Sequence, residues 1–202
     1  MPSPMRARWC AVVASIPLVG WVVSAQSSKR VDGSALRNAT KNGEDWITDG
    51  RDQFETHFSP LTQINATNVA RLGLAWSTET DSPSGGRLQA TPLMANGVLY
   101  TSLAWDVIVA TDARTRRVKW RWDPEIRRQH ISELCCGPVN RGVALYEGRL
   151  YAGLLDGRLV ALNQDTGQVL WEVKTTTNDE TLITGALRVV KGKVRRPVHV
   201  NR

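Results

Sequence analysis

Short runs of alternating apolar and polar residues fill the middle of the chain, and turn residues separate these runs. Val98–Ser102 and Val107–Asp112 form one pair of runs, and Arg149–Gly153 and Arg158–Asn163 form another. Alternation with a period of two predicts β-strands, because successive side chains of a strand point to opposite faces. The strands follow one another at hairpin spacing, so we predict an all-β body built from antiparallel meanders.

The strand pattern repeats along the chain. Gly97-Val-Leu-Tyr100 recurs 51 positions later as Gly148-Arg-Leu-Tyr151, and the same offset maps Trp120 onto Trp171. In each copy a turn opens the unit, and its last strand contains the tryptophan. Units of roughly 40 to 50 residues with about four strands and a fixed tryptophan are typical of β-propeller blades. We therefore predict sheets stacked side by side, with each tryptophan filling the gap between neighbours.

Two incomplete units flank these copies. Trp76 lies 44 residues before Trp120 and is expected in the closing strand of a preceding blade. Gly192 lies 44 residues after Gly148, and Val190–Val194 is expected as the opening strand of a third unit. About two and a half four-stranded blades are thus expected over residues 42–194. We assign the tryptophans a packing role only.

Helical periodicity is weak after residue 26. The nearest signal is Asn65–Leu72, where one or two turns are expected with Asn65 or Thr67 as the N-cap.

Residues 1–25 have the pattern of a secretory signal peptide. Arg6 and Arg8 make the start basic, Trp9–Val23 is apolar, and Ala25 is a small residue at the expected cleavage site. The apolar run is shorter than the about 20 residues of a membrane span, so export is favoured over an uncleaved membrane anchor. We expect a periplasmic protein without a stable membrane anchor, whose mature chain begins with an extension at residues 26–41.

The formal charge of +7 is concentrated at the two ends. Residues 1–25 carry two arginines and residues 195–202 carry three, neither with an acidic residue, so 7 − 2 − 3 leaves +2 for the body. A nucleic-acid surface needs Lys and Arg clustered on one folded face, and this distribution gives no support for one. Residues 195–202 lack strand alternation, and we interpret them as a non-matching basic tail.

Cysteine usage points to one adjacent pair. Cys10 lies in the predicted signal peptide, so the mature chain keeps Cys135 and Cys136. Adjacent cysteines in an oxidising compartment can pair with each other, and two free buried thiols or a metal-binding pair are the alternatives.

Several stretches together resemble the PQQ-dependent (quinoprotein) alcohol dehydrogenases. They are Trp46-Ile-Thr-Asp-Gly-Arg-Asp52, Gln89-Ala-Thr-Pro-Leu93, Cys135-Cys136 with Val139-Asn-Arg-Gly142, and Asp156-Gly-Arg-Leu-Val-Ala-Leu162. The resemblance extends from about Asn42 to Val194. It implies that the chain is the N-terminal part of an eight-bladed propeller, with PQQ near its axis beside a calcium or lanthanide ion.

The resemblance also implies roles for five residues. Cys135 and Cys136 match a disulfide that covers one face of the quinone, and Arg141 matches an arginine that reaches the quinone oxygens. Thr184 matches a threonine that hydrogen-bonds a cofactor carboxylate. Gln89 stands where many relatives have a glutamate near the cofactor, so we expect a weak contact there.

No catalytic residue and no metal ligand is assigned to this chain. In the family, the metal-binding glutamate, the catalytic aspartate base and the tryptophan floor lie beyond the position of Val194, and His57, His130 and His199 share no metal-ligand spacing. The family reaction is oxidation of a primary alcohol by hydride transfer to PQQ, with a cytochrome c as electron acceptor. We expect a truncated protein that is inactive alone. The alternatives are a non-enzymatic propeller scaffold of the cell envelope and an inert frameshifted fragment.

Overall fold

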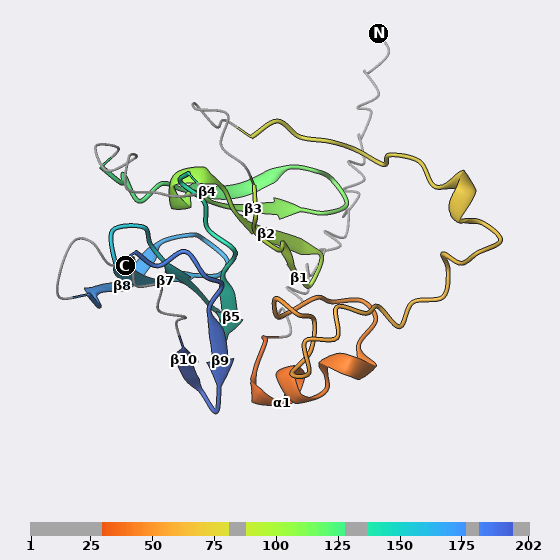
Figure 1. Ribbon diagram of the computed structural model, residues 1–202, viewed down its shortest axis with the longest axis horizontal. Helices are drawn as coiled ribbons and strands as arrows, with labels where there is room; N and C mark the ends of the chain where they lie inside the picture. Colours follow the sequence, from red (N-terminus) through yellow and green to blue (C-terminus); the bar gives the residue numbers. More distant parts are fainter. Residues whose placement is uncertain (1–29, 81–87, 128–136, 177–181, 196–202) are drawn as a thin grey trace, which may run out of the picture.

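The computed structural model describes residues 30–80, 88–127, 137–176 and 182–195, and the regular structure of these residues is almost entirely β (Figure 1). The first blade is a four-stranded antiparallel sheet in sequence order. Its strands are β1 (Leu93–Ala95), β2 (Val98–Ser102), β3 (Ile108–Asp112) and β4 (Val118–Trp122). Short local connections produce this order, because each turn returns the chain alongside the strand that it has just left.

The second blade repeats the first. It contains β5 (Ala144–Tyr146), β6 (Arg149–Gly153), β7 (Arg158–Asn163) and β8 (Val169–Lys174), again in sequence order. The registers agree in detail, since Tyr100 pairs with Ala110 in the first blade and Tyr151 pairs with Ala161 in the second. Each third-to-fourth strand pair also has an irregularity at an equivalent place, Ala110/Thr111 and Ala161/Leu162. The predicted repeat of antiparallel meanders is confirmed.

The third unit corrects the sequence prediction. Val190–Val194 was expected as one strand, but the chain forms a hairpin of β9 (Arg188–Val190) and β10 (Lys193–Arg195). Lys191 and Gly192 make its turn, both with positive φ. The turn therefore falls where a strand centre was expected. The short β1 and β5 occupy the same place before the turns of the complete blades and were also missed.

The tryptophan of the expected preceding blade is not in a strand. Residues 73–80 have no regular secondary structure, and Trp76 is half-buried. A strand forms only when its backbone groups find a neighbouring strand, and none pairs with residues 73–80 among the described residues. The expectation of a closing strand at Trp76 is therefore wrong for this structure.

Helical structure in the described residues is confined to short turns. Within the expected Asn65–Leu72 segment, only the 3-10 turn η2 (Val69–Arg71) forms, with Asn68 at its N-cap. No sequence pattern indicated α1 (Gly33–Arg37), whose N-cap Asp32 accepts a hydrogen bond from the Ala35 amide at 2.7 Å. The remaining 3-10 turns are η1 (Ala39–Lys41) and η3 (Ala104–Asp106). No helix in the described part of the chain is long and apolar enough to cross a membrane.

The hydrophobic core lies between the first two blades. Its fully buried members come from both sheets and include Leu93, Ile108, Leu145, Leu150 and Leu162. Ile47 and Val31, from the segment around α1, join the same cluster. A smaller cluster around Leu187 packs the β9–β10 hairpin against the second blade. The two blades and the hairpin are thus successive layers held by apolar contacts.

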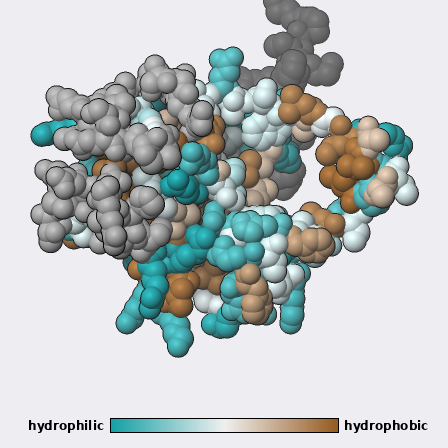
Figure 2. Space-filling view, in the orientation of Figure 1, coloured by the Kyte–Doolittle hydropathy of each residue, from teal (hydrophilic) through white to brown (hydrophobic). Residues whose placement is uncertain are grey.

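One segment leaves this body. Residues 57–80 run outward as an extended chain, yellow in Figure 1, and apolar side chains gather on it in Figure 2. The exposed large apolar residues between positions 54 and 80 are Phe54, Phe58, Leu61, Ile64, Val69, Leu72 and Leu74.

Candidate functional site

Four segments from different parts of the chain converge on Gly142. A Cβ atom at this position would lie 3.5 Å from the Ala186 Cβ, 3.5 Å from the Thr91 carbonyl oxygen and 3.9 Å from the Asp49 carboxylate. Gly142 also has φ of +139°, a conformation that suits glycine. These distances are ordinary van der Waals contacts, so it is the positive φ that favours glycine at this position. The convergence brings together the N-terminal segment, the approach to β1, the approach to β5 and the approach to β9.

Arg141 and Thr184 form a polar pair at this convergence. The Arg141 backbone amide donates to the Thr184 carbonyl at 2.9 Å, and one guanidinium nitrogen lies 3.0 Å from the Thr184 hydroxyl oxygen. The Thr91 amide donates to the Arg141 carbonyl at 3.3 Å. The Thr184 hydroxyl oxygen accepts from Arg141 and keeps its own hydrogen to donate. An exposed guanidinium beside a free hydroxyl hydrogen suits an anionic, carboxylate-bearing ligand.

A buried polar network lies directly behind this pair. Asn140 is 2 % exposed, and its amide nitrogen donates to Asp106 at 2.9 Å and to the Gly153 carbonyl at 2.7 Å. Its amide oxygen accepts from the Gly142 amide at 2.9 Å and from the Ser102 hydroxyl at 3.3 Å. Asp106 accepts in addition from the Leu155 amide at 2.5 Å. This network connects the two blades.

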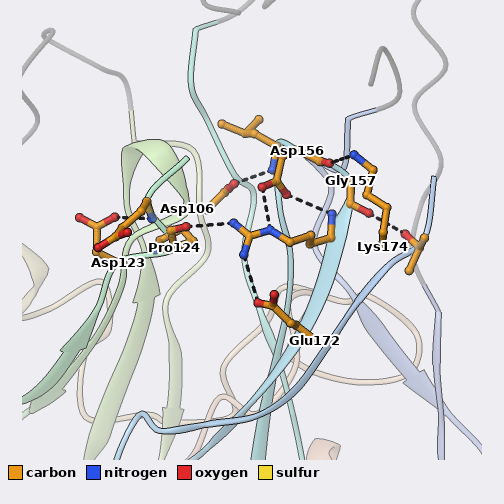
Figure 3. A network of polar contacts seen from close by, with 11 residues as sticks. Asp106, Asp123, Pro124, Asp156, Gly157, Glu172 and Lys174 are labelled. Carbon is orange, nitrogen blue, oxygen red and sulfur yellow. Dashed lines mark hydrogen bonds and ion pairs between the residues drawn. The ribbon is translucent and has the colours of Figure 1, made fainter. Parts of the chain in front are cut away.

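Burial has a large effect on the acidity of Asp106. Desolvation raises the pKa of its carboxyl to about 7, although the hydrogen bonds from Leu155 and Asn140 act in the opposite direction. Arg158 is a nearby cation and lowers this pKa, while Asp156 raises it. Arg158 donates to Asp156, Glu172 and the Pro124 carbonyl at 2.7, 3.1 and 2.9 Å, and these three labelled partners are drawn in Figure 3. Asp106 can therefore change charge close to neutral pH.

An ion-pair cluster fixes the third unit to the N-terminal segment. Arg188 in β9 donates to Glu55 at 2.8 Å and to Asp49 at 2.9 Å. It also donates to the Ala186 and Leu187 carbonyls at 3.3 Å. The Asp49 carboxylate is the one that approaches Gly142. Arg188 thus holds one side of the convergence in place.

The five predicted site residues lie in three different situations in the structure. It places Arg141 and Thr184 in contact with each other, and their binding to a cofactor stays a prediction. Gln89 is exposed and lies two residues before Thr91, on the chain that approaches the pair. Cys135 and Cys136 lie outside the described residues, so their predicted disulfide stays a prediction.

Sequence reasoning missed the residues that support the pair. Asn140 was part of the quoted Val139-Asn-Arg-Gly142 motif but received no role, and Asp106 was not singled out. A signal for Asp106 exists in the repeat, because the offset of 51 places it opposite Gly157 of the second blade. Within the described residues no group of three or more His, Cys, Asp or Glu side chains is arranged to hold a metal ion.

Comparison with known proteins defines the class of this fold and site. The family model for the β-propeller domain of glucose, ethanol and alcohol dehydrogenases, which carry PQQ, matches residues 46–173. The match covers both blades and the Arg141 segment, and it includes more than half of the chain. The chain belongs to this family.

Individual relatives narrow the class. The chain is similar to the quinohemoprotein alcohol dehydrogenase ADH IIB of Pseudomonas putida, with 43 % identity over 96 % of this chain and 27 % of that protein. It is 45 % identical to a 1-butanol dehydrogenase (cytochrome c) of Thauera butanivorans, over 75 % of this chain and 22 % of that one. A solved europium-containing methanol dehydrogenase superposes with a TM-score of 0.76 and 33 % identity, over 83 % of this chain and 29 % of that one. The chain therefore spans about a quarter of the length of these relatives.

Proposed function

We propose that this chain provides the first blades, and one wall of the cofactor site, of a PQQ-dependent dehydrogenase that oxidises primary alcohols. The observation that carries the proposal is the Arg141–Thr184 pair, at 3.0 Å, where four separate segments meet. The names of two relatives, a quinohemoprotein alcohol dehydrogenase and a 1-butanol dehydrogenase (cytochrome c), support the same reaction class. A non-enzymatic scaffold has no need for an exposed cation and hydroxyl held together at such a point.

The pair fits PQQ by its chemistry. PQQ carries carboxylates and an orthoquinone, and a guanidinium fork is suited to such planar oxygen acceptors. In this role Arg141 donates to the quinone oxygens and Thr184 donates its hydroxyl hydrogen to a cofactor carboxylate. When bound, PQQ with its metal ion accepts the hydride of the alcohol, and the protein contributes binding and orientation.

The metal and the remaining site groups belong to the same proposal. A calcium or lanthanide ion is proposed beside PQQ, and the europium content of one relative supports a site that can accept a lanthanide. We further propose that Cys135 and Cys136 form a disulfide over the quinone and that Gln89 makes a weak contact with the cofactor. A cytochrome c is the proposed electron acceptor, in keeping with the name of the 1-butanol dehydrogenase. Export to the periplasm is proposed from residues 1–25.

Binding of PQQ tests the role of the pair. PQQ affinity would be measured by equilibrium dialysis, for the chain and for Arg141→Ala and Thr184→Val. Loss of a charge-assisted hydrogen bond is worth about 1.5–3 kcal/mol, so Arg141→Ala is expected to weaken binding by roughly ten- to a hundredfold. Thr184→Val removes the hydroxyl at similar volume and is expected to weaken binding by roughly tenfold.

Arg121→Ala is the matched control. Arg121 lies in β4, is exposed and pairs with exposed Asp123 at 3.5 Å, so its removal changes the net charge equally. It is expected to leave PQQ affinity unchanged. Equal losses for Arg121→Ala and Arg141→Ala would mean that general charge attracts PQQ, and the proposal would fail.

Catalysis by the chain alone is a separate test. The described residues offer no metal-binding cluster of acidic or histidine side chains, so we expect no dye-linked alcohol oxidation with PQQ and calcium supplied. Robust turnover by the purified chain would contradict the assignment of the catalytic groups to other parts of the family's ring.

A further inference from the structure

Neighbouring residues Asn140 and Arg141 make their contacts on opposite sides of the chain. Arg141 contacts Thr184 at the candidate site, whereas the Asn140 side chain enters the buried network between the blades. An amide side chain has two hydrogens to donate and one oxygen that can accept twice. All four of these possibilities are used, by Asp106, the Gly153 carbonyl, the Gly142 amide and the Ser102 hydroxyl. The position of Asn140 is therefore fixed from four directions, and so is the backbone on either side of it.

Asp106 reaches Asn140 from a left-handed turn. Its φ is 58°, and that of the preceding Trp105 is 62°. At the equivalent position of the second blade the chain has Gly157, with φ of 77°. Glycine adopts this conformation freely, whereas other residues do so at a cost of order 1 kcal/mol. The first blade thus has an aspartate with a strained backbone at a position where glycine would carry no strain. This indicates a role for the carboxylate.

We propose that Asp106 and Asn140 are positioning residues, which hold the chain at Pro138–Gly142 between the two blades so that Arg141 meets the cofactor. The backbone contacts of the segment support this. The Trp105 amide donates to the Pro138 carbonyl at 3.0 Å, and the Gly142 amide donates to Asn140 at 2.9 Å. Both ends of the segment are therefore attached to the same buried network. The inference rests on the proposed function of Arg141.

The network also makes this positioning sensitive to pH. The partners of the two Asp106 oxygens are the Leu155 amide and the Asn140 amide, and both are donors. A proton on either oxygen adds a donor and leaves that oxygen a weaker acceptor, so the hydrogen bond that it accepts is weakened. The charged groups that act on Asp106 are Asp156 in the β6–β7 turn and Arg158 at the start of β7. The charged form of Asp106 makes the stronger hydrogen bonds, while its burial favours the neutral form.

NMR titration of the chain from about pH 5 to 9 tests the coupling. The backbone amide signals of Leu155, Gly142 and Arg141 are expected to move together, with a midpoint near the Asp106 pKa of about 7. Asp106→Asn is expected to abolish the common titration. Asn140→Ala is expected to leave Leu155 titrating, because its amide bonds Asp106 directly, but to uncouple Gly142 and Arg141. A merely structural role for Asn140 would not separate these signals in this way.

The control variant is Asp123→Asn, which removes an exposed carboxylate from the end of the first blade and is expected to leave all three signals titrating. Arg141 and Gly142 signals that stay fixed across this range in the unaltered chain would overturn the proposal. So would signals that still follow Leu155 in Asn140→Ala.

PQQ affinity separates this inference from the proposed function. Asn140→Ala is expected to weaken PQQ binding by roughly tenfold, and Asn163→Ala serves as its control. Asn163 caps a turn of the second blade by accepting from the Asp165 and Thr166 amides, so its loss perturbs stability without touching the network. If Arg141→Ala leaves PQQ affinity unchanged, the proposed function fails, and the NMR titration still decides the coupling. If Arg141→Ala weakens binding and Asn140→Ala does not, only the positioning role fails.

Discussion

Trp120 and Trp171 occupy the same place in consecutive blades but have different surroundings. Each contacts the tyrosine of its own sheet in a tilted arrangement, with ring centroids 6.2 Å apart for Tyr100–Trp120 and 6.0 Å for Tyr151–Trp171. Trp120 is 9 % exposed, and its indole nitrogen donates to the Gln164 carbonyl of the next blade at 3.0 Å. Trp171 is 40 % exposed. The two positions differ because a complete four-stranded sheet follows Trp120, whereas only the two-stranded β9–β10 sheet follows Trp171 among the described residues.

This difference shows what a blade needs from its neighbour. Trp120 packs so closely on Gly167 that a Cβ there would lie 2.6 Å from the indole ring. All six residues of β8 are exposed, because no further complete sheet covers them among the described residues. Burial of Trp120 is thus a contact between blades, in which the first blade supplies the tryptophan and the second supplies the turn at Gly167.

Replacing each of the two tryptophans by alanine should give the largest difference in stability between the equivalent positions of the two blades. Trp120→Ala is expected to lower the free energy of unfolding by about 4 kcal/mol, because it leaves a buried cavity and an unpaired Gln164 carbonyl. Trp171→Ala removes the same ring contact with tyrosine but no buried interface, and a loss of about 1 kcal/mol is expected. Urea denaturation followed by circular dichroism measures both. Equal losses would show that the interface with the next blade contributes nothing.

Asp106 provides a second contrast, since the second blade has Gly157 in its place. The folded chain keeps the proton of Asp106 up to a pKa of about 7, while the unfolded chain releases it near the ordinary value of 3.8. Raising the pH between these values therefore favours the unfolded chain, and above pH 7 the effect is complete. Between about pH 4.5 and 7 the stability from this group should fall by about 3 kcal/mol.

Urea denaturation at several pH values measures this loss as the difference between the unaltered chain and Asp106→Asn. Asp52 and Asp112 have lowered pKa values, chiefly because of hydrogen bonds from Thr56 and Thr115, so they make stability rise with pH. Both proteins contain these two residues, so their effect cancels when one pH profile is subtracted from the other. Parallel pH profiles for the two proteins would show that Asp106 ionises normally.

The turn at Gly167, on which Trp120 packs, offers a second way to test this contact. Gly167→Ala introduces both a positive φ of 73° for alanine and a clash with Trp120. Gly97→Ala is the matched control, because its φ is 76° and no atom lies within 4 Å of the added Cβ. We expect a loss of about 1 kcal/mol for Gly97→Ala and about 3 kcal/mol for Gly167→Ala. Thermal unfolding would measure both, and similar losses would argue against close packing of the indole on the turn.

The smallest effect is expected at the first blade's own turn. Arg116 occupies the position equivalent to Gly167 and has φ of 66°. Its amide donates to the Asp112 carbonyl at 2.8 Å, as that of Gly167 donates to Asn163 at 2.9 Å. Arg116→Gly should relieve the strain and stabilise the chain by about 1 kcal/mol, as an increase in urea midpoint. A decrease would mean that the arginine side chain makes a contact worth more than the strain.

Local patterns predicted the sheets but not what lies between them. The 51-residue repeat located β2, β6 and β7 correctly, because alternation and turn residues act within a few positions. The three-residue strands β1 and β5 are too short to show alternation. Arg141 and Thr184 were found through family motifs, and the structure places them in contact.

The supporting residues depend on contacts that no local pattern encodes. Asp106 and Asn140 are separated by 34 positions, and Arg188 and Asp49 by 139. Their pairing follows from how the blades stack and not from spacing along the chain. Asp106 could be noticed only by comparing the repeats, as the one place where a carboxylate replaces a turn glycine.

The long reach of Arg188 has a consequence for the order of folding. Each blade closes through hairpins between neighbouring strands, whereas Arg188 joins β9 to Asp49 and Glu55 across more than 130 residues. Closing so large a loop loses more chain entropy than any hairpin, so this contact should form after the sheets. The ion-pair cluster should therefore join the third unit to the N-terminal segment only after the sheets have formed. Folding is expected to show a slow phase, and Arg188→Met should remove this phase while the sheets still form.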